Sequence, residues 1–277
     1  MRRLQLFFYL IHLLVIQSWL MAQNTAKVWQ YLEEGLYLGI FDAPIKSKMG
    51  DSKITVLKID PAFFDINIYC ASEYQKKLRT ARDWALEFGL SACINAGMYA
   101  TDYLTSVGYL KCGSHLNNPY INKAYNSIFA CDPVGDDVPP IKLIDRRCED
   151  FSQWKDKYNS FSQSIRMISC HRKNVWKQQP RQWSIAALGI DQSGNLLLIH
   201  CRSPYSVHDF INMLLVLPLD IQQAMYLEGG PEASLYFRSK NLERELVGIY
   251  ETSFLVSNDN RMALKIPNII GIKRKSN

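Results

Sequence analysis

Hydrophobic and polar residues alternate along much of this chain with the two-residue period of a β-strand. The alternation is clearest in residues 53–60 and 63–71, which Pro61 separates. A short entry element is expected from Trp29 to Leu36. Short apolar runs predict further strands at residues 90–94, 186–191, 195–201, 224–227, 233–237, 247–256 and 266–272. Residues 162–169 also read as a strand.

Three segments are expected to be helical. In residues 75–88 the apolar positions recur at helical spacing, and Gly89 follows where a helix often ends. Ser206 and Asp209 give a capping-box start to the apolar run 210–217, which Pro218 ends. A third, short helix is predicted at residues 149–158.

The order of these elements determines the expected fold class. Strands outnumber helices, and Gln192-Ser193-Gly194 is typical of a hairpin turn between two strands. No Pro/Ser-rich linker or internal repeat divides the chain. We therefore expect an α+β fold, a single domain with a mixed, largely antiparallel curved β-sheet flanked by a few helices.

The N-terminus has the pattern of a secretory signal. A basic start, with Arg2 and Arg3, precedes an almost uncharged apolar stretch at residues 6–20, and Ala22 offers a small residue for cleavage. We predict a signal peptide at residues 1–22 and a functional domain at residues 23–277, in a secreted or periplasmic protein with no membrane span after signal removal. The alternative is an uncleaved membrane anchor.

Charge narrows the range of partners. The chain has 32 basic and 26 acidic residues, a net charge of +6. Its one basic cluster is the tail at residues 273–275, which gives no phosphate-tracking stripe, so no nucleic-acid partner is expected. The oligomeric state cannot be read from the sequence.

The seven cysteines carry no metal or redox motif. None is in a C-x-x-C or C-x-x-H pair, and an odd number leaves at least one free thiol. Disulfide pairing cannot be read from the sequence, and the default expectation is a small buried hydrophobe at each position. The cysteines are Cys70, Cys93, Cys112, Cys131, Cys148, Cys170 and Cys201.

Two strand ends carry polar, glycine-containing turns, Cys93-Ile-Asn-Ala-Gly-Met-Tyr and Tyr226-Leu-Glu-Gly-Gly-Pro. Glu228, a carboxylate after a buried strand and before two glycines, is the strongest candidate for acid, base or nucleophile chemistry. Its alternative role is to cap the N–H groups of the turn. No ligand series demands a metal, so no cofactor is predicted, although carboxylates around Glu228 leave a divalent cation possible.

An ordered set of motifs resembles the phosphodiester glycosidase family. The set is Asn95-Ala-Gly-Met-Tyr, Val107-Gly-Tyr-Leu, Ser162-Gln-Ser, Ala187-Leu-Gly-Ile-Asp and Tyr226-Leu-Glu-Gly-Gly-Pro, and the resemblance runs from Trp29 to the C-terminus. It implies a hydrolase that cleaves the glycosidic bond of a sugar-1-phosphodiester and releases sugar and a phosphomonoester. The implied partner is a glycosyl phosphodiester or related glycan.

Two positions depart from the family pattern. Glu228 stands where Asp is usual, and Ile185 stands where many members have Arg. Arg166 stands where Pro is common and could supply the missing phosphate contact, or it could be an ordinary solvent-facing strand residue. The resemblance implies that Glu228 serves the oxocarbenium-like centre or directs water, that Arg166 binds phosphate, and that substrate is bound by Asn95, Gly97, Gln163, Gly229, Gly230 and Glu232.

Two other functions fit parts of the sequence. A non-catalytic carbohydrate- or phosphate-binding protein could retain the scaffold without the usual Asp and Arg. A Cys/His hydrolase is the weakest interpretation, because no cysteine has a recognisable nucleophile setting and His115, His171 and His200 lack metal-ligand spacing.

Overall fold

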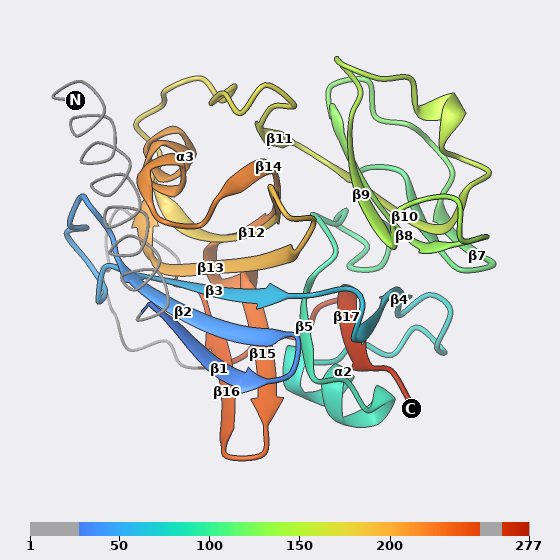
Figure 1. The fold of residues 1–277 in the computed structure, drawn as a ribbon, viewed down its shortest axis with the longest axis horizontal. Helices are drawn as coiled ribbons and strands as arrows, with labels where there is room; N and C mark the ends of the chain where they lie inside the picture. Colours follow the sequence, from blue (N-terminus) through green and yellow to red (C-terminus); the bar gives the residue numbers. More distant parts are fainter. Residues whose placement is uncertain (1–27, 250–261, 277) are drawn as a thin grey trace, which may run out of the picture.

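Antiparallel β-strands dominate the computed structural model, which describes residues 28–249 and 262–276. The strands form three sheets (Figure 1). The first has seven strands, in the order β1 (Trp29–Glu33), β2 (Leu36–Asp42), β3 (Lys53–Ile59), β13 (Leu196–Tyr205), β12 (Trp183–Asp191), β14 (Ile221–Gly229) and β11 (Arg166–Ile168).

The other two sheets have five strands each. The second, at the right of Figure 1, has the order β7 (His115–Asn118), β6 (Leu110–Cys112), β10 (Tyr158–Ser164), β8 (Ser127–Pro133) and β9 (Ile141–Asp145). The third has the order β16 (Leu242–Val247), β15 (Ser234–Ser239), β5 (Ala92–Asn95), β17 (Asn268–Arg274) and β4 (Phe64–Cys70).

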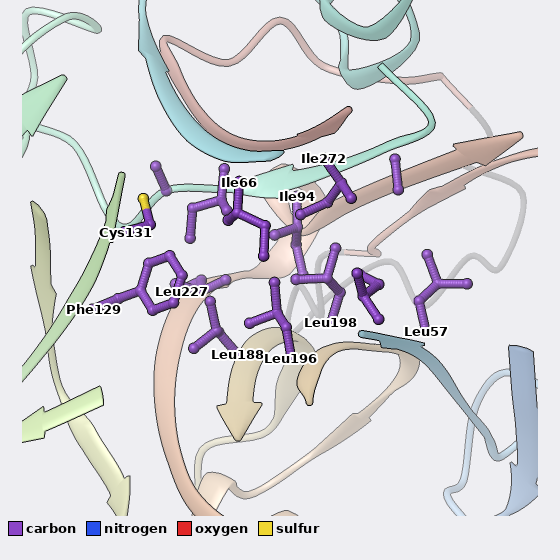
Figure 2. Packing of buried hydrophobic residues seen from close by; sticks show 14 of the residues in the cluster. Leu57, Ile66, Ile94, Phe129, Cys131, Leu188, Leu196, Leu198, Leu227 and Ile272 are labelled. Carbon is purple, nitrogen blue, oxygen red and sulfur yellow. The ribbon is translucent and has the colours of Figure 1, made fainter. Parts of the chain in front are cut away.

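The main hydrophobic core lies where inward faces of all three sheets meet (Figure 2). Alternate residues of the strands that line this core point into it, as the two-residue period requires. The first sheet contributes Leu188, Leu198 and Leu227, the second contributes Phe129 and Cys131, and the third contributes Ile66, Ile94 and Ile272.

Two α-helices in the described ranges cover outer sheet faces. Helix α3 (Val207–Val216) packs on the first sheet, and its N-cap Ser206 accepts a hydrogen bond from the backbone N–H of Asp209, as the capping-box pattern predicts. Helix α2 (Ala81–Phe88) packs its buried Trp84 against the third sheet. It begins at Ala81 rather than residue 75, because Thr80 caps it and Gln75 and Lys76 have left-handed backbone conformations.

The expected fold class needs correction in three respects. One mixed sheet was expected, but the described strands form three sheets, and every ladder between them is antiparallel. The fold is more β-rich than a balanced α+β protein. The helix predicted at residues 149–158 is wrong, because only a 3₁₀ turn, η1 (Phe151–Gln153), forms there.

The strand predicted at residues 162–169 is divided between two sheets. Its first part belongs to β10 in the second sheet, and its second part is β11 in the first sheet. The chain passes from one sheet to the other at Ile165, whose carbonyl accepts a hydrogen bond from the backbone N–H of Tyr226. Of the predicted strand 247–256, only residues 247–249 lie among the described residues, and β16 ends at Val247.

Two disulfides, Cys70–Cys112 and Cys148–Cys170, correct the default expectation for these four cysteines. Cys93, Cys131 and Cys201 are free and buried, as expected. The predicted signal peptide lies outside the described residues. Within them, no helix is long and apolar enough to cross a membrane.

Candidate active site

The two glycine-containing strand ends meet at one open pocket of about 450 Å³. They come together because β15, which follows the turn after β14, pairs with β5 and places Leu235 opposite Ile94. Two carboxylates, Glu228 and Glu232, line the pocket together with Met98, Tyr99, Ala100, Thr101, Tyr103, Val107 and Tyr125.

Glu228 is the partly buried carboxyl at the end of β14. Its pKa is raised from 4.5 to about 8, chiefly by burial and to a lesser extent by the nearby Glu232 carboxylate. The backbone N–H of Gly229, which donates to Glu228 Oε1 at 3.0 Å, acts in the opposite direction. Glu228 therefore carries a proton at neutral pH, as a proton donor in catalysis would.

The two glycines after Glu228 are fitted closely to neighbouring protein atoms. A Cβ atom on Gly229 would lie 2.1 Å from the Tyr226 hydroxyl and 2.4 Å from Trp183 Cδ1. Gly230 has a left-handed backbone conformation with φ of 66°. The structure thus accounts for both glycines through packing and turn geometry, in addition to the substrate approach that the sequence predicts.

Asn95 lies behind the pocket rather than in its lining. Its side chain donates to the Glu232 carbonyl at 2.9 Å and accepts from the Ser234 N–H at 2.8 Å. Asn95 is only 1% exposed, and through these two hydrogen bonds it holds the turn that carries Glu232. Gly97, two residues further on, has a φ of 123°, and its position would bring a Cβ atom to 3.6 Å from the Ser162 hydroxyl.

Gln163 also supports the pocket from behind. Its Oε1 accepts from the N–H groups of Tyr109 and Asn122, and its Nε2 donates to the carbonyls of Asn122 and Tyr125. The amide is 1% exposed and has its hydrogen-bonding groups engaged by these contacts. Gln163 thereby fixes the segment that carries Tyr125 into the pocket wall.

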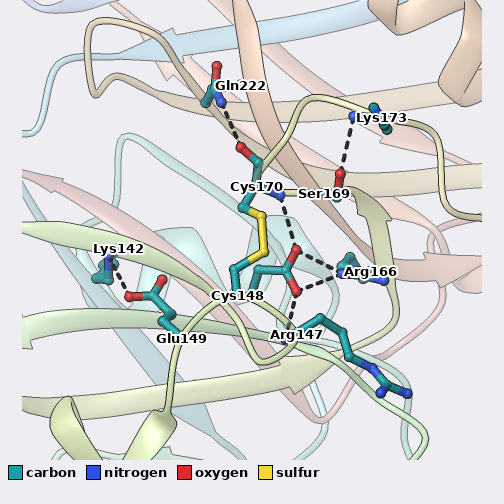
Figure 3. Close-up of a disulfide and its surroundings, with 10 residues drawn as sticks. Lys142, Arg147, Cys148, Glu149, Arg166, Ser169, Cys170, Lys173 and Gln222 are labelled. Atoms are coloured by element: carbon teal, nitrogen blue, oxygen red, sulfur yellow. Dashed lines mark hydrogen bonds and ion pairs between the residues drawn. A yellow bond between two sulfur atoms is a disulfide. The ribbon is translucent and has the colours of Figure 1, made fainter.

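Arg166 is held by a buried carboxylate outside the pocket lining (Figure 3). Its Nη1 donates to both oxygens of Asp145, at 2.8 and 2.9 Å. Asp145 also accepts from the backbone N–H groups of Arg147 and Cys170, each at 3.0 Å, and the Cys148–Cys170 disulfide fastens the same two segments. The structure brings Arg166 to this cluster and does not bring it into contact with Glu228.

Ile185, which stands where the family pattern often has Arg, contributes no cation to the pocket. Ile185 is fully buried in the apolar cluster under α3, and it lies opposite Gly229 in the sheet. No Lys or Arg is among the residues that line the pocket in the described ranges. The pocket is acidic and aromatic in character.

Other potential reactive groups are unsuited to catalysis. Among the described residues, the group that could hold a metal ion consists of Cys148, Cys170 and His171, and the two sulfur atoms are bonded to each other in the disulfide. Burial raises the pKa of the thiols of Cys93 and Cys201 and keeps them protonated. Burial likewise lowers the pKa of His200 to about 4.

The aromatic residues that line the pocket are the part of the site that the sequence predicts least well. Tyr99 and Tyr103 fit both sugar stacking and ordinary core packing from the sequence, and Tyr125 carries no signal of its own. These three tyrosines reach the pocket because they lie in the long connections before β6 and after β7, which fold over the ends of β5 and β14.

Comparisons with known proteins agree with this geometry. The sequence model described as phosphodiester glycosidase matches residues 88–273. No curated protein sequence matches the chain significantly. The zebrafish N-acetylglucosamine-1-phosphodiester alpha-N-acetylglucosaminidase catalytic domain, auto-inhibited by its pro-peptide, is similar in structure, with a TM-score of 0.60 and 12% identity over 89% of this chain and 86% of that chain.

A hypothetical protein from Synechocystis is similar with a TM-score of 0.58 and 13% identity, over 87% of this chain and 62% of that chain. At such low identities, the two structural similarities establish the fold alone.

Proposed function

Since the chain belongs to the phosphodiester glycosidase family, we propose that it hydrolyses the bond between the anomeric carbon of a sugar and a phosphodiester oxygen. The products are free sugar and a phosphomonoester. N-acetylglucosamine, which the name of the zebrafish enzyme contains, is the first sugar to test.

The observation that carries this proposal is the placement of two carboxyl groups, Glu228 and Glu232, in the lining of one pocket, where burial raises the pKa of Glu228. As the anomeric C–O bond breaks, its electron pair goes to the departing phosphate oxygen, and Glu228 donates a proton to that oxygen. Glu232 stabilises the positive charge at the anomeric carbon and accepts a proton from the attacking water. Paired carboxyl groups divide acid and base work in this way in glycoside hydrolysis.

The raised pKa of Glu228 changes the role that the sequence suggests for it. To act as an ionised carboxylate beside the oxocarbenium-like centre, Glu228 would require a pH above about 8. Below that pH, the neutral Glu228 carboxyl adds no negative charge to a pocket that receives an anionic phosphodiester. It therefore serves the leaving group, in a pocket whose lining in the described ranges contains no Lys or Arg.

Arg166 stays a proposed phosphate contact. Asp145 occupies its Nη1, whereas Nε and Nη2 make no hydrogen bond to any described residue. That free edge of the guanidinium could bind two oxygens of a phosphate extending from the pocket. The proposed role therefore applies to the phosphate side of a bound substrate.

We also propose that the protein is exported. The basic and apolar N-terminal sequence supports a signal peptide cut after Ala22. The two disulfides support an oxidising compartment. N-terminal sequencing of protein recovered outside the cytoplasm is expected to begin at Gln23, and a chain that begins at Met1 would contradict the cleavage.

The deciding experiment measures sugar release from a panel of sugar-1-phosphodiesters by residues 23–277. The matched pair of variants is Glu228→Gln and Glu34→Gln, since Glu34 is an exposed carboxylate in the turn between β1 and β2. Sugar release that only Glu228→Gln abolishes supports the proposal. Saturable sugar binding without release from any donor would instead favour a non-catalytic carbohydrate-binding protein.

A further inference from the structure

One exposed tyrosine stands at the mouth of the pocket on a rigid loop. The loop comprises residues 98–107 and is closed like a hairpin: the Ala100 N–H donates to the Thr105 carbonyl at 2.7 Å, and the Val107 N–H donates to the Met98 carbonyl at 3.1 Å. Tyr103 lies at its tip, and its own N–H donates to the Ala100 carbonyl. The loop holds its shape through these backbone bonds.

Asp102 fixes the tip itself. Its Oδ1 accepts from the backbone N–H groups of Leu104 and Thr105, each at 2.9 Å, and its Oδ2 accepts from the Thr105 hydroxyl at 2.6 Å. From outside the loop, Asn117 donates to the Leu104 carbonyl at 3.0 Å and accepts from the Ser106 N–H at 2.8 Å. The position of Tyr103 is therefore set before any ligand arrives.

The conformation of Tyr103 is unfavourable for its residue type. Its φ is 58°, in the left-handed region where a bulky side chain is disfavoured. Its side chain is also 59% exposed, so burial of the ring gives little compensation. Strained residues held by surrounding hydrogen bonds cluster at ligand-binding sites. Packing of the protein alone thus gives no reason for a tyrosine here.

The surroundings of the ring indicate what it would bind. The Tyr103 ring lies 5.9 Å from the ring of Tyr99, and both line the pocket that holds Glu228 and Glu232. A pyranose has an apolar C–H face suited to an aromatic ring and hydroxyl groups suited to carboxylate acceptors. A pocket lined by both aromatic rings and carboxylates matches both features.

We propose that Tyr103 is the sugar-stacking residue of this pocket, with Tyr99 supporting its ring. The inference rests on the proposed function only in taking this pocket as the substrate-binding site. Sugar binding can be measured without turnover, so the inference is tested separately from hydrolysis. The ligand class is a pyranose ring, and the contribution of Tyr103 is to affinity rather than to bond breaking. Its removal should therefore raise KM and leave kcat nearly unchanged.

The test compares Tyr103→Asn with Tyr103→Phe and Tyr31→Asn. Asn tolerates the left-handed backbone, and Phe retains the ring. Tyr31 is a matched control on β1, because it is 62% exposed and its ring lies 5.9 Å from that of Tyr37. Binding of N-acetylglucosamine, glucose, galactose and mannose is titrated by calorimetry, and Tm is recorded for each variant.

Tyr103→Asn is expected to weaken binding of the preferred sugar about tenfold without lowering Tm, while Tyr103→Phe and Tyr31→Asn bind as the parent does. The proposal is overturned if Tyr103→Asn binds within about twofold of the parent, if Tm falls with affinity, or if none of the four sugars binds. Loss of sugar release in Glu228→Gln tests the proposed function separately, since that result does not depend on Tyr103.

Discussion

Replacing Glu228 by Gln should change the pH dependence of both stability and activity. The folded-state pKa of Glu228 is about 8, above its ordinary value of 4.5. As pH rises, the unfolded chain therefore releases this proton first, and the folded state binds more protons than the unfolded state. The free energy of unfolding then falls between about pH 4.5 and about pH 8 and changes no further above that range.

The size of this loss follows from the two pKa values. The interval from 4.5 to about 8 sets a ceiling of about 5 kcal/mol, at roughly 1.4 kcal/mol for each pH unit. Glu228 is partly exposed to the pocket, so we expect about half of that ceiling, on the order of 2 kcal/mol. Gln cannot ionise, and Glu228→Gln should therefore gain about this much stability relative to the parent between pH 4.5 and pH 8.5.

The assay is urea denaturation of the parent, Glu228→Gln and Glu34→Gln at both pH values. The expected result is a higher free energy of unfolding for Glu228→Gln alone, and only at pH 8.5. A pH-dependent difference below about 0.5 kcal/mol would refute the raised pKa. In the sugar-release assay, kcat of the parent should fall above about pH 8, and Glu228→Gln should lose about 100-fold or more of kcat and with it this alkaline limb.

Three further changes test the supports of the site. Asp145→Asn should cost about 3 kcal/mol in urea denaturation, because the guanidinium of Arg166 loses its buried carboxylate partner, and a cost below about 1 kcal/mol would contradict that pairing. Gln163→Leu should cost about 3 kcal/mol through four lost hydrogen bonds, and unchanged stability would refute its bracing role. Cys170→Ser should cost about 2 to 4 kcal/mol by opening the Cys148–Cys170 link, and equal stability with and without reductant in the parent would exclude that contribution.

The sequence by itself determined the local features of this protein. Residue alternation and short apolar runs together predicted most strands, and the Ser206 and Asp209 pattern predicted the start of α3. The polar hairpin between β12 and β13 was likewise predicted, where Asp191 accepts from the N–H groups of Ser193 and Asn195. These features depend on hydrogen bonds and periods within a few residues, so the order of residues is sufficient to specify them.

The candidate site was only partly visible in the sequence. Glu228 stood out because it follows a buried strand and precedes two glycines, which let a substrate approach the backbone. Its raised pKa was not visible, since that shift comes from burial under segments distant in the sequence. The aromatic lining of the pocket was only partly visible for the same reason. Sugar stacking was one of two uses that the sequence left open for Tyr99 and Tyr103, and Tyr103 reaches the pocket through the shape of its loop.

Only the tertiary structure decided which distant residues meet. The segment 162–169 reads as one strand, yet the chain crosses between two sheets at Ile165. Asn95 and Glu232 are 137 positions apart and share a hydrogen bond. Arg166 pairs with Asp145 across 21 residues, where the sequence offered phosphate or solvent as its partner. Such pairings depend on how the sheets pack together, because a strand's period specifies which of its faces is buried but not which strand will lie against it.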